Sequence, residues 1–138
     1  MRFTRKILAL GFLLCAATAS LAGAPQNPPP ELQSELVGYS SSDFARYGPP
    51  VESFRDVHIR YEALPSGGRS YLLCGQFRAP AAGSDSPWTN FATIKTDPYE
   101  QWIGKMAQAH CERATAIATE PQDLSAVLKA RLDATEPE

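Results

Sequence analysis

The stretch SYLLCGQFRA, Ser70–Ala79, decides the fold of this chain, because it places a cysteine in the middle of an apolar run. Leu72, Leu73 and Cys74 make both faces of the run apolar, a pattern typical of a central β-strand. A cysteine in such a strand has three interpretations: a nucleophile, a metal ligand, or one half of a disulfide bond. The surrounding sequence favours the third.

The segments on either side of this stretch predict two more strands. Upstream, four apolar residues alternate with polar ones: Val57, Ile59, Tyr61 and Ala63. This period of two indicates a strand with one buried face and one solvent-exposed face. Pro65–Arg69, PSGGR, joins it to the cysteine strand, because paired glycines suit a tight turn. Downstream, Trp88–Thr96 contains aromatic and β-branched residues and predicts a third strand.

Two helices are predicted before and after these strands. The first spans residues 31–47 and ends at the Gly-Pro-Pro of residues 48–50. The second begins with Asp97 as N-cap and Pro98 in its first turn, and it runs to Ala114. Its apolar stripe has helical spacing: Tyr99, Trp102, Ile103, Met106, Ala107, His110, Cys111 and Ala114. This stripe turns Cys111 toward the sheet that contains Cys74.

A last helix completes the predicted domain. It begins at Thr119 or Glu120, just before Pro121, and its apolar side consists of Leu124, Val127, Leu128 and Leu132. Strands followed by helices predict an α+β fold. We expect a small three- to four-stranded antiparallel sheet packed against C-terminal helices, with one disulfide, as a single domain over residues 31–133.

The N-terminus has the composition of a secretory signal peptide. Its basic residues come first, namely Arg2, Arg5 and Lys6, and an apolar run over residues 7–17 and the small residues ATASLAGA follow. The apolar segment is too short for a membrane span of about 20 residues. We expect cleavage after Ala22 or Ala24, so that residues 1–24 are removed and the exported chain has no integral membrane span.

The flanks of the domain carry no predicted structure of their own. Residues 25–30 form a Pro-rich leader, and residues 134–138 form a frayed acidic tail. Cys15 lies in the signal peptide behind Leu14, where a bacterial lipobox has a small residue, so lipidation is not favoured. Removal of the signal takes 3 of the 13 basic residues and none of the 15 acidic ones, which leaves a net charge of −5. This acidic balance argues against a nucleic-acid partner.

The two cysteines that remain predict a disulfide. The exported chain has an even number of cysteines, Cys74 and Cys111, in a compartment that oxidises thiols. By closing a loop, a bond between them would stabilise the fold by about 3–4 kcal/mol. A zinc site with His58 and His110, or thiol catalysis, is the alternative. The ligand spacings lack the form of structural zinc sites, and no C-x-x-C motif is present. We therefore expect no metal and no cofactor.

The sequence contains no catalytic motif and favours binding over catalysis. It has no G-x-S-x-G, H-E-x-x-H, P-loop or G-x-G-x-x-G. Four residues are candidates for a binding surface: Trp88, Arg60, Arg78 and His58. Trp88 is either an exposed interface anchor or a ring folded over the sheet edge. Arg55 either recognises a carboxylate or pairs with an acid of the same domain.

Three elements together resemble a group of small exported bacterial proteins without an assigned activity. That group has an S-x-F-R-x-V motif, here carried by Phe54, Arg55 and Val57, then a Cys-Gly strand, here Cys74-Gly75, and a Cys-bearing C-terminal helix. The similarity covers residues 50–114. The Gly-rich aromatic loop typical of the group is reduced here. The resemblance implies the fold and the disulfide, and it implies no mechanism.

Two functional classes follow, with an enzyme as a third. We expect a non-catalytic periplasmic or secreted binding or accessory protein of the bacterial cell envelope, whose partner is a protein or another envelope component. The alternative is an inhibitor or immunity protein against a periplasmic hydrolase. Exported lysozyme inhibitors carry an S-G-x-x-Y loop, and SGGRSY, Ser66–Tyr71, is similar with one residue more. An enzyme that uses a reactive cysteine is the least favoured class.

Overall fold

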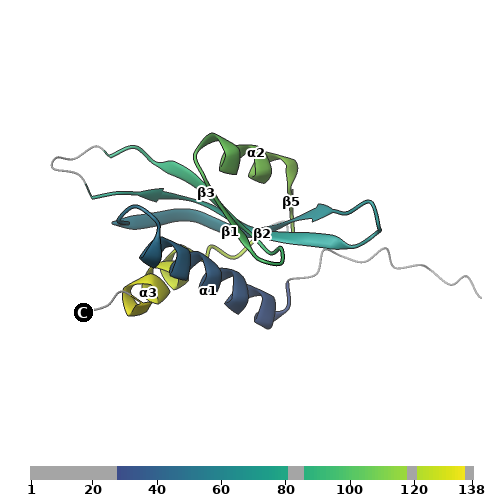
Figure 1. The fold of residues 1–138 in the computed structure, drawn as a ribbon, viewed down its shortest axis with the longest axis horizontal. Helices are drawn as coiled ribbons and strands as arrows, with labels where there is room; N and C mark the ends of the chain where they lie inside the picture. Colours follow the sequence, from purple (N-terminus) through teal and green to yellow (C-terminus); the bar gives the residue numbers. More distant parts are fainter. Residues whose placement is uncertain (1–27, 81–85, 118–120, 136–138) are drawn as a thin grey trace, which may run out of the picture.

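A computed structural model describes residues 28–80, 86–117 and 121–135 of the chain. The predicted signal peptide, with Cys15, lies outside the described residues, as does the first half of the leader, residues 25–27. The described part forms an antiparallel sheet of five strands in the order β4-β3-β2-β1-β5, with helices on both faces (Figure 1). The strands are β1 (Ser53–Ala63), β2 (Arg69–Arg78), β3 (Thr89–Ile94), β4 (Glu100–Ile103) and β5 (Thr115–Ala116). The helices are α1 (Pro30–Arg46), α2 (Lys105–Arg113) and α3 (Ser125–Thr135).

The cysteine strand lies in the centre of the sheet, as predicted. β2 pairs with β1 on one side, from Ser53↔Arg78 to Ala63↔Arg69, and with β3 on the other. Leu72 and Leu73 are fully buried on opposite faces, because helices cover both sides of this strand. The predicted α+β class and the three long strands are confirmed, and the short strands β4 and β5 bring the sheet to five.

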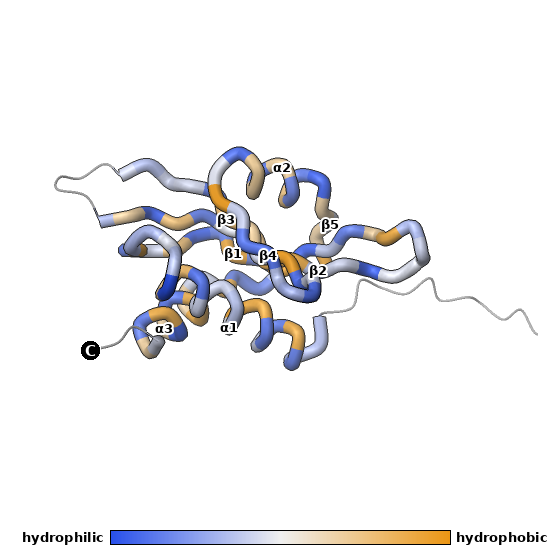
Figure 2. Tube along the Cα trace, in the orientation of Figure 1, coloured by the Kyte–Doolittle hydropathy of each residue, from blue (hydrophilic) through white to orange (hydrophobic). Residues whose placement is uncertain are grey.

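The larger core lies between the sheet and the helices α1 and α3. Figure 2 shows the hydrophobic positions of both helices turned toward the strands. Phe44 of α1 packs edge-on against Phe54, Phe77 and Phe91, with ring centroids 5.1–5.4 Å apart. Aromatic rings favour this geometry because a positive edge meets a negative face. Residues spaced three and four apart supply the buried side of α1: Leu32, Leu36, Val37, Ser40, Ser41 and Phe44.

Gly75 leaves room for this aromatic cluster. A Cβ atom at Gly75 would lie 2.7 Å from Cγ2 of Val57 and 2.9 Å from Cε1 of Phe91, closer than carbon atoms approach. Strand β2 therefore has no side chain at the point where Val57 of β1 and Phe91 of β3 point into the core. The Cys-Gly pair is therefore used on both faces of the sheet. Gly75 makes room for the aromatic cluster on one face, and Cys74 points to the α2 side on the other.

The smaller core lies under α2 and contains the disulfide. Sγ of Cys74 bonds Sγ of Cys111, and the two Cα atoms are 5.9 Å apart. The buried neighbours on this face are few: Leu72, Ile94 and Ala114, with Trp102 half-buried beside them. The predicted disulfide is confirmed, and it joins the central strand to the helix that covers this face.

The predicted helix from Asp97 to Ala114 is wrong in its first half. Residues Glu100–Ile103 form β4, which pairs with β3 from Ile94↔Glu100 to Phe91↔Ile103. The edge of β3 offers unpaired backbone groups, and pairing satisfies them, so tertiary context overrides the helical stripe. Gly104, with φ of 77°, ends the strand, and α2 begins at Lys105. Met106 of the predicted stripe is 53% exposed.

The last helix begins later than predicted. Thr119 and Glu120 lie outside the described residues, and α3 runs from Ser125 to Thr135. Leu124, Leu128 and Leu132 are buried as expected, whereas Val127 is 44% exposed. The helix therefore also extends two residues into the segment predicted to be a frayed tail.

Removing the disulfide by the double change Cys74→Ala and Cys111→Ala should lower the free energy of unfolding by about 3–4 kcal/mol. The bond closes a loop with a sequence separation of 37 residues, and the unfolded chain regains that loop entropy. Urea unfolding followed by circular dichroism measures the difference. A reducing agent should lower the stability of the parent and leave the double variant unchanged; equal sensitivity of both would contradict the assignment.

Gly75→Ala should destabilise the domain by about 1–3 kcal/mol, because the new methyl group overpacks the contact between Val57 and Phe91. Thermal or urea unfolding measures the loss. Gly68→Ala is the matched control, since its Cβ would meet only Cδ1 of Leu64, at 3.7 Å. A loss at Gly68 as large as that at Gly75 would refute the packing explanation.

Candidate functional site

A hollow of about 330 Å³ lies between α2 and the sheet, and the disulfide is part of its lining. We call it the α2 hollow. Its lining comes from both the helix and the sheet: Asp56, Arg60, Cys74, Gly75, Gln76, Asn90, Gln108, Cys111 and Glu112. Except for the disulfide and the glycine, these residues are polar or charged. A surface depression lined in this way suits a polar ligand.

Side-chain amides form the polar part of the hollow. Nε2 of Gln76 donates to Oδ1 of Asn90 at 3.2 Å, and Oε1 of Gln76 accepts from Nε of Arg55 at 2.8 Å. Across the hollow, Nε2 of Gln108 donates to Oε1 of Glu112 at 2.8 Å. Amides both donate and accept, so this lining can match a ligand that carries both kinds of group.

Trp88 lies beside two guanidinium groups at the end of the sheet. The Cζ atom of Arg55 is 4.2 Å from the ring centroid, and that of Arg78 is 5.0 Å away. The ring is half-buried, so it lies against its neighbours more than it projects into solvent. Such contacts are cation–π interactions, which favour arginine over an indole. We call these three residues the Trp88 stack.

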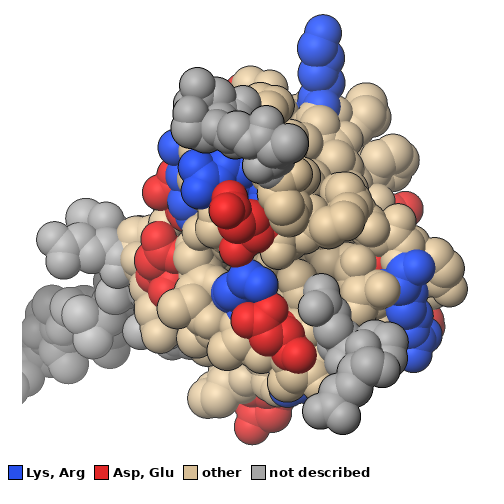
Figure 3. All heavy atoms as spheres, turned by 90° about the vertical axis from the view of Figure 1, so that its left-hand side faces the viewer, with Lys and Arg blue, Asp and Glu red and all other residues tan. Residues whose placement is uncertain are grey.

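Both arginines of the Trp88 stack also meet acids. Nε of Arg78 donates to Oε2 of Glu52 at 3.0 Å, and Nε of Arg55 lies 3.8 Å from Oδ2 of Asp56. Of the two interpretations of Arg55, the structure therefore supports pairing with an acid of the same domain. Figure 3 views this end of the molecule, where acidic and basic side chains alternate with no large area of one sign.

The predicted binding residues fall into three separate places. Arg60 lines the α2 hollow, where its Nη1 approaches the carbonyl oxygen of Ala114 at 3.5 Å. Trp88 and Arg78 share the stack, and His58 faces the segment before α3. The sequence interpretation missed the amides of the hollow. One sequence signal could have found Gln76: alternation along a strand places it on the same face as Cys74. The contact between Gln76 and Asn90 could not be predicted, because it depends on the register of β2 with β3.

A β-bulge in β1 builds a second polar group. The pairing with β2 shifts between Arg55 and His58, and Asp56 takes a φ of 53°, a value that aspartate tolerates better than most residues. The backbone of Val57 then bonds the segment before α3: its oxygen accepts from N of Leu124 at 2.7 Å, and its nitrogen donates to Oγ of Ser125 at 3.3 Å.

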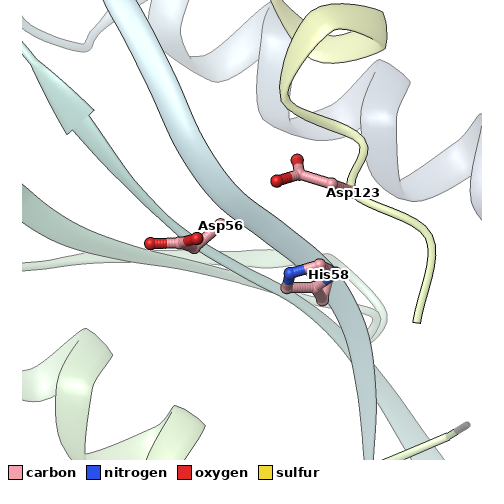
Figure 4. A group of neighbouring side chains, drawn as sticks. All are labelled: Asp56, His58 and Asp123. Atoms are coloured by element: carbon pink, nitrogen blue, oxygen red, sulfur yellow. The ribbon is translucent and has the colours of Figure 1, made fainter. Parts of the chain in front are cut away.

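Asp56, His58 and Asp123 lie near one another at this bulge, with the side chain of Asp56 extending away from the other two (Figure 4). One potential ligand atom from each residue lies within 4.8 Å of those of the other two. Nδ1 of His58 lies 3.0 Å from the carbonyl oxygen of Gln122. Two of the residues come from β1 and the third from the segment before α3, so the bulge and its backbone contacts position the group.

The carboxyl group of Asp123 is held in its charged form. Partial burial alone would raise its pKa, but hydrogen bonds from the side chain and backbone of Ser125 outweigh this and lower the pKa below its ordinary value. Oδ1 accepts from N of Ser125 at 2.8 Å and from its Oγ at 2.5 Å. Nearby His58 lowers the pKa further. Asp123 is therefore a carboxylate at neutral pH.

Comparison with family models, with curated proteins and with solved structures finds no match for this chain. The resemblance to small exported bacterial proteins therefore stays a prediction. Of the helices that the structure describes, none has the length and apolar character needed to cross a membrane.

Arg55→Ala and Trp88→Ala should show a coupling of about 0.5–1 kcal/mol in a double-mutant cycle, because each change removes the same cation–π contact. Urea unfolding of the two single variants and the double variant gives the coupling energy. The control cycle pairs Trp88→Ala with Arg69→Ala, which stacks on Tyr61 at the other end of β2 and should show no coupling. Additive effects in both cycles would show that the stack contributes nothing.

Proposed function

We propose that this chain is an exported, non-catalytic binding protein of the bacterial cell envelope, and that the α2 hollow and the neighbouring Trp88 stack form its ligand-binding surface. The observation that carries the proposal is the hollow itself, in which amides and charges of both signs surround a disulfide. Disulfides persist in oxidising compartments such as the periplasm, which supports export.

Binding is favoured over thiol chemistry because both cysteines of the described residues are used. Cys74 and Cys111 share one bond, which leaves neither sulfur as a thiolate nucleophile. His110, the histidine next to Cys111, is half-buried, with its ring 5.4 Å from that of Trp102 and its Nδ1 at 3.0 Å from a guanidinium nitrogen of Arg113. The pair therefore does not form the base and nucleophile of a cysteine enzyme.

The lining of the hollow favours a peptide segment as ligand. Gln76, Asn90 and Gln108 offer the donor and acceptor groups that a peptide backbone needs. Arg60 adds one basic group and Asp56 and Glu112 add two acidic groups, so either an acidic or a basic side chain of the ligand finds a counter-charge. Trp88 supplies apolar area at the rim, as aromatic residues do at interfaces. We infer a protein of the envelope as partner.

Site-specific photocrosslinking in the cells that make the protein tests this surface. A photoreactive amino acid at Gln108 or Asn90 should yield a defined crosslinked partner, since both positions line the α2 hollow. The same probe at Asp133, an exposed position on α3 at the opposite face, is the matched control and should yield none. Absence of a crosslink at the hollow, or equal products at Asp133, would refute the proposal.

A hydrolase inhibitor is the second candidate, and one feature favours it. The hairpin of β1 and β2 projects beyond the helices, with Gly67 at its tip in a left-handed conformation (Figure 1). Leu64 is exposed there, and Arg69 stacks on Tyr61 at 4.1 Å. A projecting loop of this kind suits insertion into an enzyme cleft. Inhibition of a peptidoglycan hydrolase by the purified chain, abolished by Arg69→Ala and unaffected by Gln108→Ala, would select this function over the first.

A further inference from the structure

We propose that Asp56, His58 and Asp123 form a binding site for a divalent cation of the Zn²⁺ class. Their ligand atoms, two carboxylate oxygens and one imidazole nitrogen, all lie within 4.8 Å of one another. Atoms that share one tetrahedral zinc ion at about 2.0–2.2 Å lie about 3.3–3.6 Å apart. Rotation of the two exposed carboxylates must therefore bring the three ligand atoms closer together to close the site. The proposal stands whether or not the α2 hollow binds a ligand.

The two acidic side chains of this group favour a cation as the ligand. Two acidic side chains, Asp56 and Asp123, each place a ligand atom within 4.8 Å of the other's, so a cation between them would be attracted by both. Arg55 approaches Asp56 from one side only, at 3.8 Å, and the donors to Asp123 from Ser125 are neutral. A cation between the two carboxylates replaces repulsion with attraction.

One ring nitrogen of His58 is held by a backbone carbonyl group. The carbonyl oxygen of Gln122 can only accept a hydrogen bond, so Nδ1 of His58, at 3.0 Å, carries the proton. The lone pair is then on Nε2. Metal-bound histidines commonly donate their other ring N–H to a backbone carbonyl, because this fixes the ring and the tautomer. Gln122 thus supplies the support that a ligating imidazole needs, and it lies next to the ligand Asp123.

The donor set selects the class of cation. Zn²⁺ accepts imidazole nitrogen and carboxylate oxygen in a four-coordinate site. Ca²⁺ takes six to eight oxygen ligands, and Mg²⁺ strongly favours an octahedron of oxygens, so two carboxylates and an imidazole suit neither. Three protein ligands leave the fourth position of the zinc to water or to a donor from outside. Asp56 also lines the α2 hollow.

Isothermal titration of the chain with zinc chloride tests the site. The protein is the disulfide-bonded exported chain, purified without an affinity tag and treated with a chelator. We expect one Zn²⁺ per chain, and Ca²⁺ binding at least about tenfold weaker. Asp56→Asn, His58→Gln and Asp123→Asn should each weaken Zn²⁺ binding about 10- to 100-fold or more. Asparagine tolerates the φ of Asp56, and its Oδ1 can accept the hydrogen bond from N of Ser125 that Asp123 accepts, so these variants should preserve the fold.

His110→Gln is the matched control, because His110 lies on α2 outside this group, and its zinc affinity should equal that of the parent. No binding to the parent, or parental affinity in His58→Gln, would overturn the proposal. If a variant fails to fold by circular dichroism, the ring resonances of the parent decide the question. Addition of Zn²⁺ should shift those of His58, whereas shifts confined to His110 would refute the site.

Discussion

The bond between Cys74 and Cys111 is the constraint on which the α2 face of this protein depends. Helix α2 buries only Ala107 among its own residues, and the apolar cluster beneath it is small. Apolar burial therefore contributes little to holding α2, and the covalent bond to the central strand takes its place. Beside this bond, polar side chains line the space between helix and sheet. The opposite face is different, since α1 and α3 cover it with a continuous apolar core.

The bulge at Asp56 connects the two polar groups of the molecule. It turns the backbone of Val57 toward the segment before α3, and this contact brings Asp123 next to His58. The same aspartate lines the α2 hollow. A ligand in the hollow and a cation at the bulge would thus share Asp56. Binding of either one would change the affinity for the other through the carboxyl group of Asp56.

Local patterns predicted the parts of the fold that depend on near neighbours. Alternation in β1 and the apolar run of β2 predicted both strands, and the even cysteine count predicted the disulfide. The segment before α2 was wrongly predicted as a helix, because Tyr99, Trp102 and Ile103 have helical spacing. The edge of β3 instead pairs with this segment as a strand. Gly104, which ends the strand, was the sequence signal for a break at this point. The hollow and the bulge group were out of reach, since Gln76 meets Asn90, and Asp56 meets Asp123, only through strand register and a bulge.

Hydrogen exchange of the backbone amides, measured by mass spectrometry before and after reduction, tests most directly whether the disulfide holds α2 in place. On reduction, the amides of α2 should lose their protection first and to the greatest extent, while those of β1, β2 and α1 stay protected by the large core. Protection of α2 that survives reduction, or that falls only in parallel with β1 and β2, would contradict this account.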